Sequence, residues 1–210
     1  MSDTPDRFRC ALERIDGLHR EDPSRATFEG ADYPEELLYA RRMTAWLERL
    51  DPGASEALRL AVRCQHLRRW TIPRDQYPMT RAGYHQWRTT LARVHAVTAG
   101  EILREVGYGE ETVGRVQSLV RKEGLKSDPE AQTLEDAACL VFLESEFSDF
   151  AARHDEQKII GIVARTWRKM SERGRAAALA LDLSPADRAL IGKALASPPE
   201  AGATGGPEGR

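Results

Sequence analysis

Asp136 is an acidic residue at a position where little water is expected. The segment LEDAACLVFL, residues 134–143, is the most apolar run in a chain in which 30% of residues are charged. Its apolar residues cover every face of a helix, so we expect Asp136 to be buried. A buried carboxylate needs a cation, a metal or hydrogen-bond donors. Asp136 is therefore predicted either to form a structural bridge with an arginine or to take part in metal or proton chemistry.

Two histidines have the spacing expected of partners for Asp136. His66 continues a four-residue spacing of apolar residues that begins at Leu58, and His95 lies on an apolar stripe that includes Trp87. A histidine on such a stripe is often a core residue, but two histidines and an aspartate also form a set that binds divalent metals. The sequence therefore predicts His66, His95 and Asp136 as catalytic and metal-ligating candidates, with Mn, Fe, Zn or Mg as the ion.

Arginines flank both histidines along the chain. Residues 63–93 contain seven arginines, no lysine and a single acid, Asp75. Arginine binds phosphate with a planar fork of donors, which favours a phosphate-bearing ligand. The alternative is a solvated surface that pairs with acids of neighbouring helices. The candidate substrate-binding residues are Arg68, Arg69, Arg81, Arg88, Lys122 and Lys126.

The elements that must position these residues are helical. Apolar residues recur at three- and four-residue spacing and strand signals are nearly absent, which predicts an all-α fold. We interpret residues 20–34 as a loop, because they lack periodicity and carry breakers. Expected helices cover about residues 8–15, 34–50, 58 to 70–73, 80–106, a short segment closed by Gly124, a segment from 129 through the Asp136 motif, 155–171 and 184–196.

One further dipeptide, His154-Asp155, is predicted to have no role in the site. Ala-Ala-Arg precedes it and Glu-Gln-Lys follows it, so Asp155 is expected to cap a helix in contact with water. The rings of Tyr84 and Trp87 alternate with arginines, but they lie on the apolar stripe and are expected to fill the core rather than stack on a base.

Length and composition favour one domain in a reducing compartment. We expect one domain over residues 1–196, with a core at 33–146, a helical extension at 147–196 and a disordered tail at 197–210. The formal net charge is only -2, and the three cysteines are far apart. No apolar run approaches the roughly 20 residues that span a bilayer. These features predict a soluble cytoplasmic protein without a membrane partner.

Four segments, in order, resemble the motifs of the HD-domain metal-dependent phosphohydrolases. They are YARRMTAWL at 39–47, LAVRCQHL at 60–67, HAVTAGEILREVG at 95–107 and LEDAACL at 134–140. The resemblance covers about residues 33–146. It implies an all-α helical bundle, here with extra C-terminal helices, and a site in which a metal-bound water attacks a phosphate ester.

The motif residues of that family are only partly kept. His66 and Asp136 match its histidine and its last aspartate, whereas Tyr39 and Leu67 stand where it has a histidine and an aspartate. The resemblance implies either a reorganised metal site of His66, His95 and Asp136, or a metal-free remnant in which His66 and Asp136 bond each other. The basic stretch VRK, residues 120–122, replaces a further histidine of many members.

The chain as a whole resembles an uncharacterised bacterial and fungal family more closely. The segments QHLRRW, RAGYHQWR and TLEDAACLVFLE carry this resemblance. Some members bear a glutamyl-tRNA synthetase label, but the nucleotide-binding motifs of such synthetases are not visible here. Three functions stay open: a hydrolase of a phosphorylated small molecule such as a nucleotide, a non-catalytic module that binds a nucleotide or RNA, and a helical scaffold.

Overall fold

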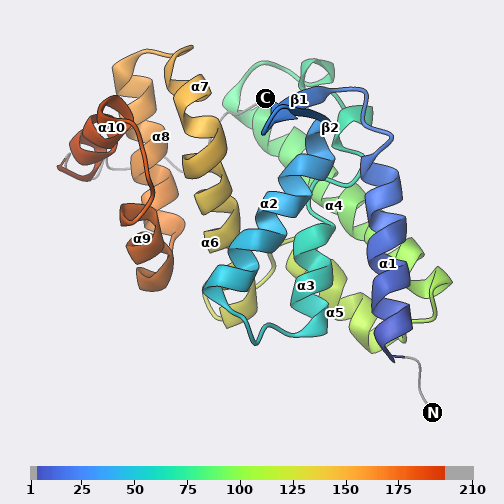
Figure 1. Cartoon of the computed structure of the whole chain (residues 1–210). Coiled ribbons are helices and arrows are strands. Elements are labelled where there is room, and N and C mark those ends of the chain that lie inside the picture. Colours follow the sequence, from blue (N-terminus) through green and yellow to red (C-terminus); the bar gives the residue numbers. More distant parts are fainter. Residues whose placement is uncertain (1–3, 197–210) are drawn as a thin grey trace. The chain divides into compact units, whose positions relative to one another are not determined.

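The described residues are mainly α-helical, which confirms the all-α prediction (Figure 1). The computed structural model describes residues 4–196, with side chains from residue 7, so the predicted tail at 197–210 lies outside the described residues. Within residues 4–196, no helix is both long and apolar enough to span a membrane.

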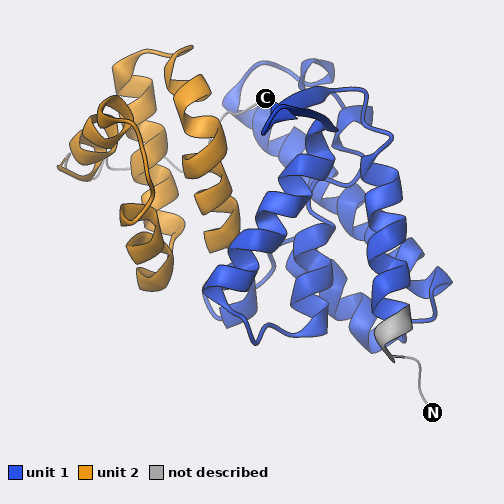
Figure 2. Cartoon of the chain, viewed as in Figure 1, with its two compact units in different colours: residues 1–134 blue, residues 135–210 orange. Residues whose placement is uncertain are grey.

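The chain divides into two compact units (Figure 2). Unit 1 comprises residues 1–134 and unit 2 comprises residues 135–210. That the two form a single domain, as the sequence analysis expects, stays a prediction. The first residues of α6 (Pro129–Val141) belong to unit 1 and the rest of this helix belongs to unit 2.

Unit 1 is built on five helices that bury one apolar core. They are α1 (Thr4–His19), α2 (Glu35–Leu50), α3 (Glu56–Arg63), α4 (Arg81–Glu105) and α5 (Glu110–Val120). Helix α3 packs against α1, α2 and α5, and α4 packs against α5 and α1. Leu58, Leu103 and Leu119 are among the fully buried side chains. The 25-residue α4 confirms the long helix predicted over 80–106.

The predicted loop at residues 20–34 is wrong in its second half, where a β-hairpin forms. Strands β1 (Arg25–Phe28) and β2 (Ala31–Pro34) pair antiparallel, with Phe28 opposite Ala31. The two turn residues, Glu29 and Gly30, both have positive φ, 50° and 76°. This is the geometry of a type I′ hairpin turn. The sequence analysis missed it because glutamate is not one of the residues that usually precede glycine there.

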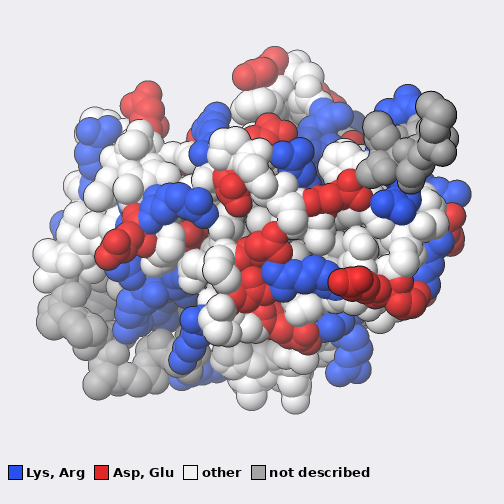
Figure 3. All heavy atoms as spheres, turned by 90° about the horizontal axis from the view of Figure 1, so that it is seen from below, with Lys and Arg blue, Asp and Glu red and all other residues white. Residues whose placement is uncertain are grey.

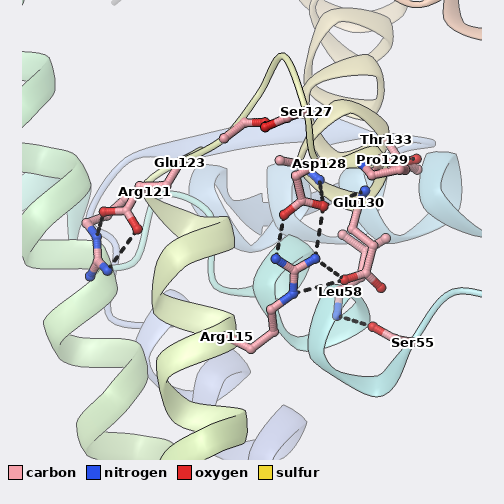
Figure 4. A network of polar contacts seen from close by, with 12 residues as sticks. Ser55, Leu58, Arg115, Arg121, Glu123, Ser127, Asp128, Pro129, Glu130 and Thr133 are labelled. Carbon is pink, nitrogen blue, oxygen red and sulfur yellow. Dashed lines mark hydrogen bonds and ion pairs between the residues drawn. The ribbon is translucent and has the colours of Figure 1, made fainter.

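The turn before α6 is held by one arginine (Figure 4). Arg115 of α5 forms ion pairs with both Asp128 and Glu130. The Oδ1 atom of Asp128 also accepts the backbone N–H of Glu130 at 3.0 Å, as an acid at a helix start should. The start signal Asp-Pro-Glu is thus confirmed, and Arg115 joins α5 to the beginning of α6.

Unit 2 contains the remaining helices and a smaller core. The elements after α6 are a π-helical turn η3 (Phe142–Glu146), α7 (Phe147–Ala151), α8 (Glu156–Lys169), α9 (Glu172–Leu179) and α10 (Pro185–Ala196). Helices α8 and α10 pack together, and Phe147 and Ile162 are almost fully buried. Helices α8 and α10 were predicted, whereas α9 was not.

Candidate functional site

His66 lies in a turn after α3 rather than on a helix, which corrects the predicted helix to residues 70–73. Helix α3 ends at Arg63, and His66 has a left-handed backbone with φ of 65°. A short 3₁₀ turn η1 (Arg69–Thr71) follows, and a second one, η2 (Arg74–Gln76), comes before α4. Leu67 is fully buried at the turn. The burial of Leu67 helps to end α3 here. No glycine or proline marks this helix end in the sequence, so a sequence pattern does not detect it.

The His66 imidazole is held on three sides. Its Nδ1 lies 2.9 Å from Oε2 of Glu36, and its Nε2 lies 3.4 Å from Nη1 of Arg69. The Tyr39 ring stacks on it, with centroids 4.0 Å apart and planes inclined by 10°. The contacts fit the tautomer in which Nδ1 donates to Glu36 and Nε2 is an acceptor.

Glu36 is the acid of this site, and the sequence analysis missed it. It lies in the first turn of α2, with a side chain that is only 13% exposed, and its Oε1 lies 3.5 Å from Nε of Arg69. Burial raises the pKa of this carboxyl to about 7, although Arg69 acts in the opposite direction. Glu36 therefore holds its proton to a higher pH than an exposed glutamate does.

His95 is the second imidazole of the site. It projects from α4 and is 5% exposed, and its ring centroid lies 5.9 Å from that of His66. Burial is the main cause that holds the pKa of both imidazoles well below the usual value. Both rings are therefore neutral at pH 7. Among the described residues, none forms a hydrogen bond with the buried Nε2 of His95.

Three predicted cations act electrostatically on the imidazoles. Arg69, Arg88 and Lys122 each add to the lowering of the His66 pKa, and the first two do the same for His95. Arg69 lies over the Trp87 ring, 4.8 Å from its centroid. Trp87 and Tyr84 belong to a buried apolar cluster, which confirms that they fill the core. The cations come from three segments, namely η1, α4 and the end of α5.

The other predicted phosphate ligands lie on the surface. Arg68 is exposed and forms an ion pair with Glu21 at 3.9 Å, and Arg81 and Lys126 are also exposed. Their part in ligand binding stays a prediction. Arg74 donates instead to the carbonyl oxygens of Tyr77 and Pro78, at 3.0 and 2.9 Å. It thereby holds the segment before α4 in place.

Asp136 is fully buried, as predicted, and its carboxylate is bonded within unit 2. Its Oδ1 accepts the backbone N–H of Ser171 at 2.8 Å, and its Oδ2 accepts the Ser171 hydroxyl. Ser171 caps α9, and a methyl group added at Gly174 would lie 2.6 Å from Cγ of Asp136. Asp136 thus anchors the start of α9. The adjacent Glu135 pairs with Lys169 at 3.5 Å.

The His154-Asp155 dipeptide has the structural role predicted for it. Asp155 is the N-cap of α8, and its Oδ1 accepts the backbone N–H of Lys158 at 2.8 Å. His154 stacks on Phe150, with ring centroids 4.2 Å apart.

The donors at the site suit an anion better than a divalent cation. Over residues 4–196, no three His, Cys, Asp or Glu side chains are arranged to hold a metal. Glu36 already faces Nδ1 of His66 and the guanidinium of Arg69. The surrounding positive charges would repel a metal ion and attract phosphate. The predicted metal ligation by His66, His95 and Asp136 stays a prediction.

A third imidazole, His19 at the end of α1, was also missed. It is fully buried, and its Nε2 lies 3.0 Å from the carbonyl oxygen of Arg63. Desolvation lowers the pKa of His19, and the electrostatic effect of His19 lowers the pKa of Glu36.

A sequence signal that could have connected Glu36 to the site is its spacing from Tyr39. Residues three apart lie on the same face of a helix.

Comparisons with known proteins identify a family for the chain, but the function of that family is not known. A search of curated proteins and a search of solved structures each gave no match. A family described as "Domain of unknown function (DUF4202)" matches residues 9–191 and so covers both units. The chain belongs to this family of uncharacterised domains.

Proposed function

We propose that the chain binds a phosphorylated small molecule, such as a nucleotide, at the site around His66 and hydrolyses its phosphate ester. One observation carries the proposal: Arg69 lies 3.4 Å from Nε2 of His66, and Arg88 and Lys122 also lower the pKa of this imidazole, while the carboxyl group of Glu36 bonds its Nδ1. Excess positive charge that is partly shielded from water favours an anion.

Arg69 and Arg88 differ in exposure and are expected to contribute to binding in different ways. Arg69 is held by Glu36 and Trp87, so its guanidinium is oriented before a ligand arrives. Arg88 is exposed, and no carboxylate among the described residues forms an ion pair with it. A phosphate that reaches Arg69 and Arg88 can accept several charge-assisted hydrogen bonds, which are about twice as strong as neutral ones.

The Glu36–His66 pair supplies a base for hydrolysis. Nη1 of Arg69, which lies 3.4 Å from Nε2 of His66, turns to the phosphate when the ligand binds. Nε2 of the neutral imidazole then takes a proton from a water as the water oxygen bonds to phosphorus. The ester P–O bond then breaks, and the proton passes from His66 to the departing alkoxide. Glu36 holds Nδ1 and stabilises the imidazolium that exists between these two proton transfers.

The resemblance to HD-domain phosphohydrolases is consistent with this proposal. Positions from three of its motif segments and the basic stretch lie together: Tyr39 stacks on His66, His95 is beside it, and Lys122 lowers its pKa. Members of that family use a metal, but the donors described here do not fit one. The proposed hydrolysis therefore uses only groups of the protein and water.

A matched pair of arginine variants tests the site. Arg88 and Arg93 are both exposed residues of α4, but only Arg88 acts on the two imidazoles. We expect a panel of nucleoside phosphates to include ligands that bind and release phosphate. Arg88→Gln should lower the affinity for these ligands by roughly tenfold, which corresponds to the loss of one charged hydrogen bond. Arg93→Gln should leave the affinity unchanged. Equal changes in affinity in the two variants would show that the ligand does not bind at the site around His66.

A non-catalytic nucleotide- or RNA-binding module is the second candidate. Two observations favour it: Tyr39 covers one face of the His66 ring, and Leu67 is buried where the resemblance expects an aspartate. Binding without phosphate release would identify it. RNA binding should also weaken steeply with salt, because many phosphate contacts release counterions. On the face in Figure 3, however, basic and acidic side chains are interspersed rather than separated.

A further inference from the structure

His95 has a ring nitrogen that the fold leaves without a partner. The residue is 5% exposed, and among the described residues none forms a hydrogen bond with its buried Nε2. Buried polar atoms are normally paired, because burial removes them from water and a missing hydrogen bond costs free energy. Packing alone therefore gives no reason for an imidazole at this position. Such an atom is explained by a catalytic role or by a water that bonds to it.

The His95 ring lies beside His66, on a part of α4 that is held firmly by α5. The two ring centroids are 5.9 Å apart, and the ring planes are inclined by 50°. Nε2 of Gln117 donates to the carbonyl oxygen of Ala96, the residue after His95, at 2.9 Å. Gly100 permits this close packing, since a methyl group added there would collide with the Gln117 side chain. His95 therefore has a fixed place before a ligand binds, as a group that orients a reactant must.

One water molecule can bond to both imidazoles. A water that donates two hydrogen bonds of about 2.8 Å holds its two acceptors roughly 4.5 to 5.5 Å apart. Each nitrogen of an imidazole lies about an ångström from the ring centre, so nitrogens of rings with centroids 5.9 Å apart can face each other at this spacing. Nη1 of Arg69 lies 3.4 Å from Nε2 of His66, and its turn toward the phosphate makes room there. The His66 side chain is 20% exposed, so water can enter from that side.

Both imidazoles can accept a hydrogen bond from this water. Nδ1 of His66 faces Glu36, which leaves Nε2 as the acceptor. Buried N–H groups without an acceptor are rare, so we assign the proton of His95 to Nδ1, which makes its Nε2 an acceptor as well. Burial holds the pKa of both rings well below the usual value, so both are neutral at pH 7. Two acceptors on one side of a water direct its lone pairs to the other side.

We propose that His95 and His66 together hold the attacking water and aim its oxygen at the phosphorus of the bound ester. One proton of the water passes to Nε2 of His66 as the oxygen bonds to phosphorus. The other proton bonds to Nε2 of His95 and stays on the oxygen, which becomes a hydroxyl group of the released phosphate. The ester P–O bond breaks, and the leaving oxygen takes the proton from His66. This inference rests on the proposed function and adds the group that orients its nucleophile.

Three substitutions separate the role of Nε2 from the role of packing. His95→Leu replaces the ring with an apolar side chain of similar size. His95→Gln places a side-chain oxygen close to the position of Nε2, whereas His95→Asn places one close to that of Nδ1. His85→Leu is the control, because His85 is an exposed histidine of the same helix.

Turnover of p-nitrophenyl phosphate measures the reaction, and the nucleotide of the panel that releases phosphate fastest replaces this ester if it is the better substrate. Calorimetry with inorganic phosphate measures binding, and urea unfolding gives the unfolding equilibrium constant.

We expect His95→Leu to lower kcat by roughly tenfold to a hundredfold, because the water is no longer oriented. The affinity for inorganic phosphate should stay within about twofold, since a neutral imidazole adds no charge to the site. The unfolding equilibrium constant should rise by less than about threefold, because Nε2 has no hydrogen bond to lose among the described residues. His95→Gln should keep more of the turnover than His95→Asn, and His85→Leu should match wild type in all three measurements.

Three results would overturn the inference and leave the proposed function standing. They are wild-type turnover in His95→Leu, a loss of turnover in that variant that is matched by lost phosphate affinity or by a rise in the unfolding equilibrium constant, and equal turnover of His95→Asn and His95→Gln. If wild type releases phosphate from neither p-nitrophenyl phosphate nor any nucleotide of the panel, the proposed hydrolysis fails and the inference with it.

Discussion

The carboxylate of Glu36 lies 2.9 Å from Nδ1 of His66, and this contact joins the first turn of α2 to the turn that follows α3. It leaves Nε2 as the acceptor nitrogen of His66, and that nitrogen faces Nη1 of Arg69 at 3.4 Å. Because Arg69 lies close to both side chains, the three residues form one electrostatic unit in the described part of unit 1.

The pH dependence of stability should reveal the buried Glu36. Its pKa is raised from 4.5 to about 7 in the folded protein, so the folded state holds this proton more tightly than the unfolded state does. Its contribution to the unfolding free energy is complete below pH 4.5 and is lost as the pH rises through 7. Relative to Glu36→Gln, wild type should lose up to about 3 kcal/mol over this range. Urea unfolding from pH 5 to 8 measures it, and a constant difference between the two proteins would contradict it.

The arginine pair on α4 should separate binding from stability. Both side chains are exposed, so Arg88→Gln and Arg93→Gln should each change the unfolding free energy by less than about 0.5 kcal/mol. Thermal shift by a bound nucleotide should shrink only in Arg88→Gln, because only Arg88 acts on His66 and His95. A loss of folding in either variant would show that these arginines are structural.

Asp136 and Ser171 should behave as one structural unit. Asp136→Ala leaves two part-buried donors of Ser171 without their acceptor and should cost about 2 to 4 kcal/mol of unfolding free energy. A double-mutant cycle with Ser171→Ala should give a coupling energy of about 1 kcal/mol or more. Asp155→Ala, which removes the exposed cap of α8, is the control and should cost about 1 kcal/mol without such coupling.

Metal content should not depend on Asp136. Both oxygens of this carboxylate accept hydrogen bonds from Ser171, so a metal that copurifies with the protein should be held by other groups. Elemental analysis of protein purified without chelators, as wild type and as Asp136→Asn, measures this. A stoichiometric metal that disappears in the variant would restore the predicted ligand set of His66, His95 and Asp136.

Sequence periodicity predicted most of the helices, although not α9, and part of the candidate site. The apolar stripe of α4 correctly placed His95 and Trp87 in the core, because a long amphipathic helix leaves few choices of face. The excess of arginine predicted cations near the imidazoles, and Arg69 lies 3.4 Å from Nε2 of His66.

The partners of the acids could not be predicted. Glu36 lies in a first helical turn, where the helix dipole favours an acid, and nothing local shows that a histidine 30 positions later contacts it. Asp136 was correctly predicted to be buried, but its partner is a helix cap 35 positions away. The end of α3 before His66 likewise depends on packing rather than on a local breaker.

Calorimetry of inorganic phosphate binding to wild type, Arg88→Gln and Arg93→Gln tests the central claim most directly. The claim is that the cations around His66 form a phosphate site. We predict measurable binding to wild type and Arg93→Gln and roughly tenfold weaker binding to Arg88→Gln. Equal affinities in all three proteins, or no binding to wild type, would contradict it.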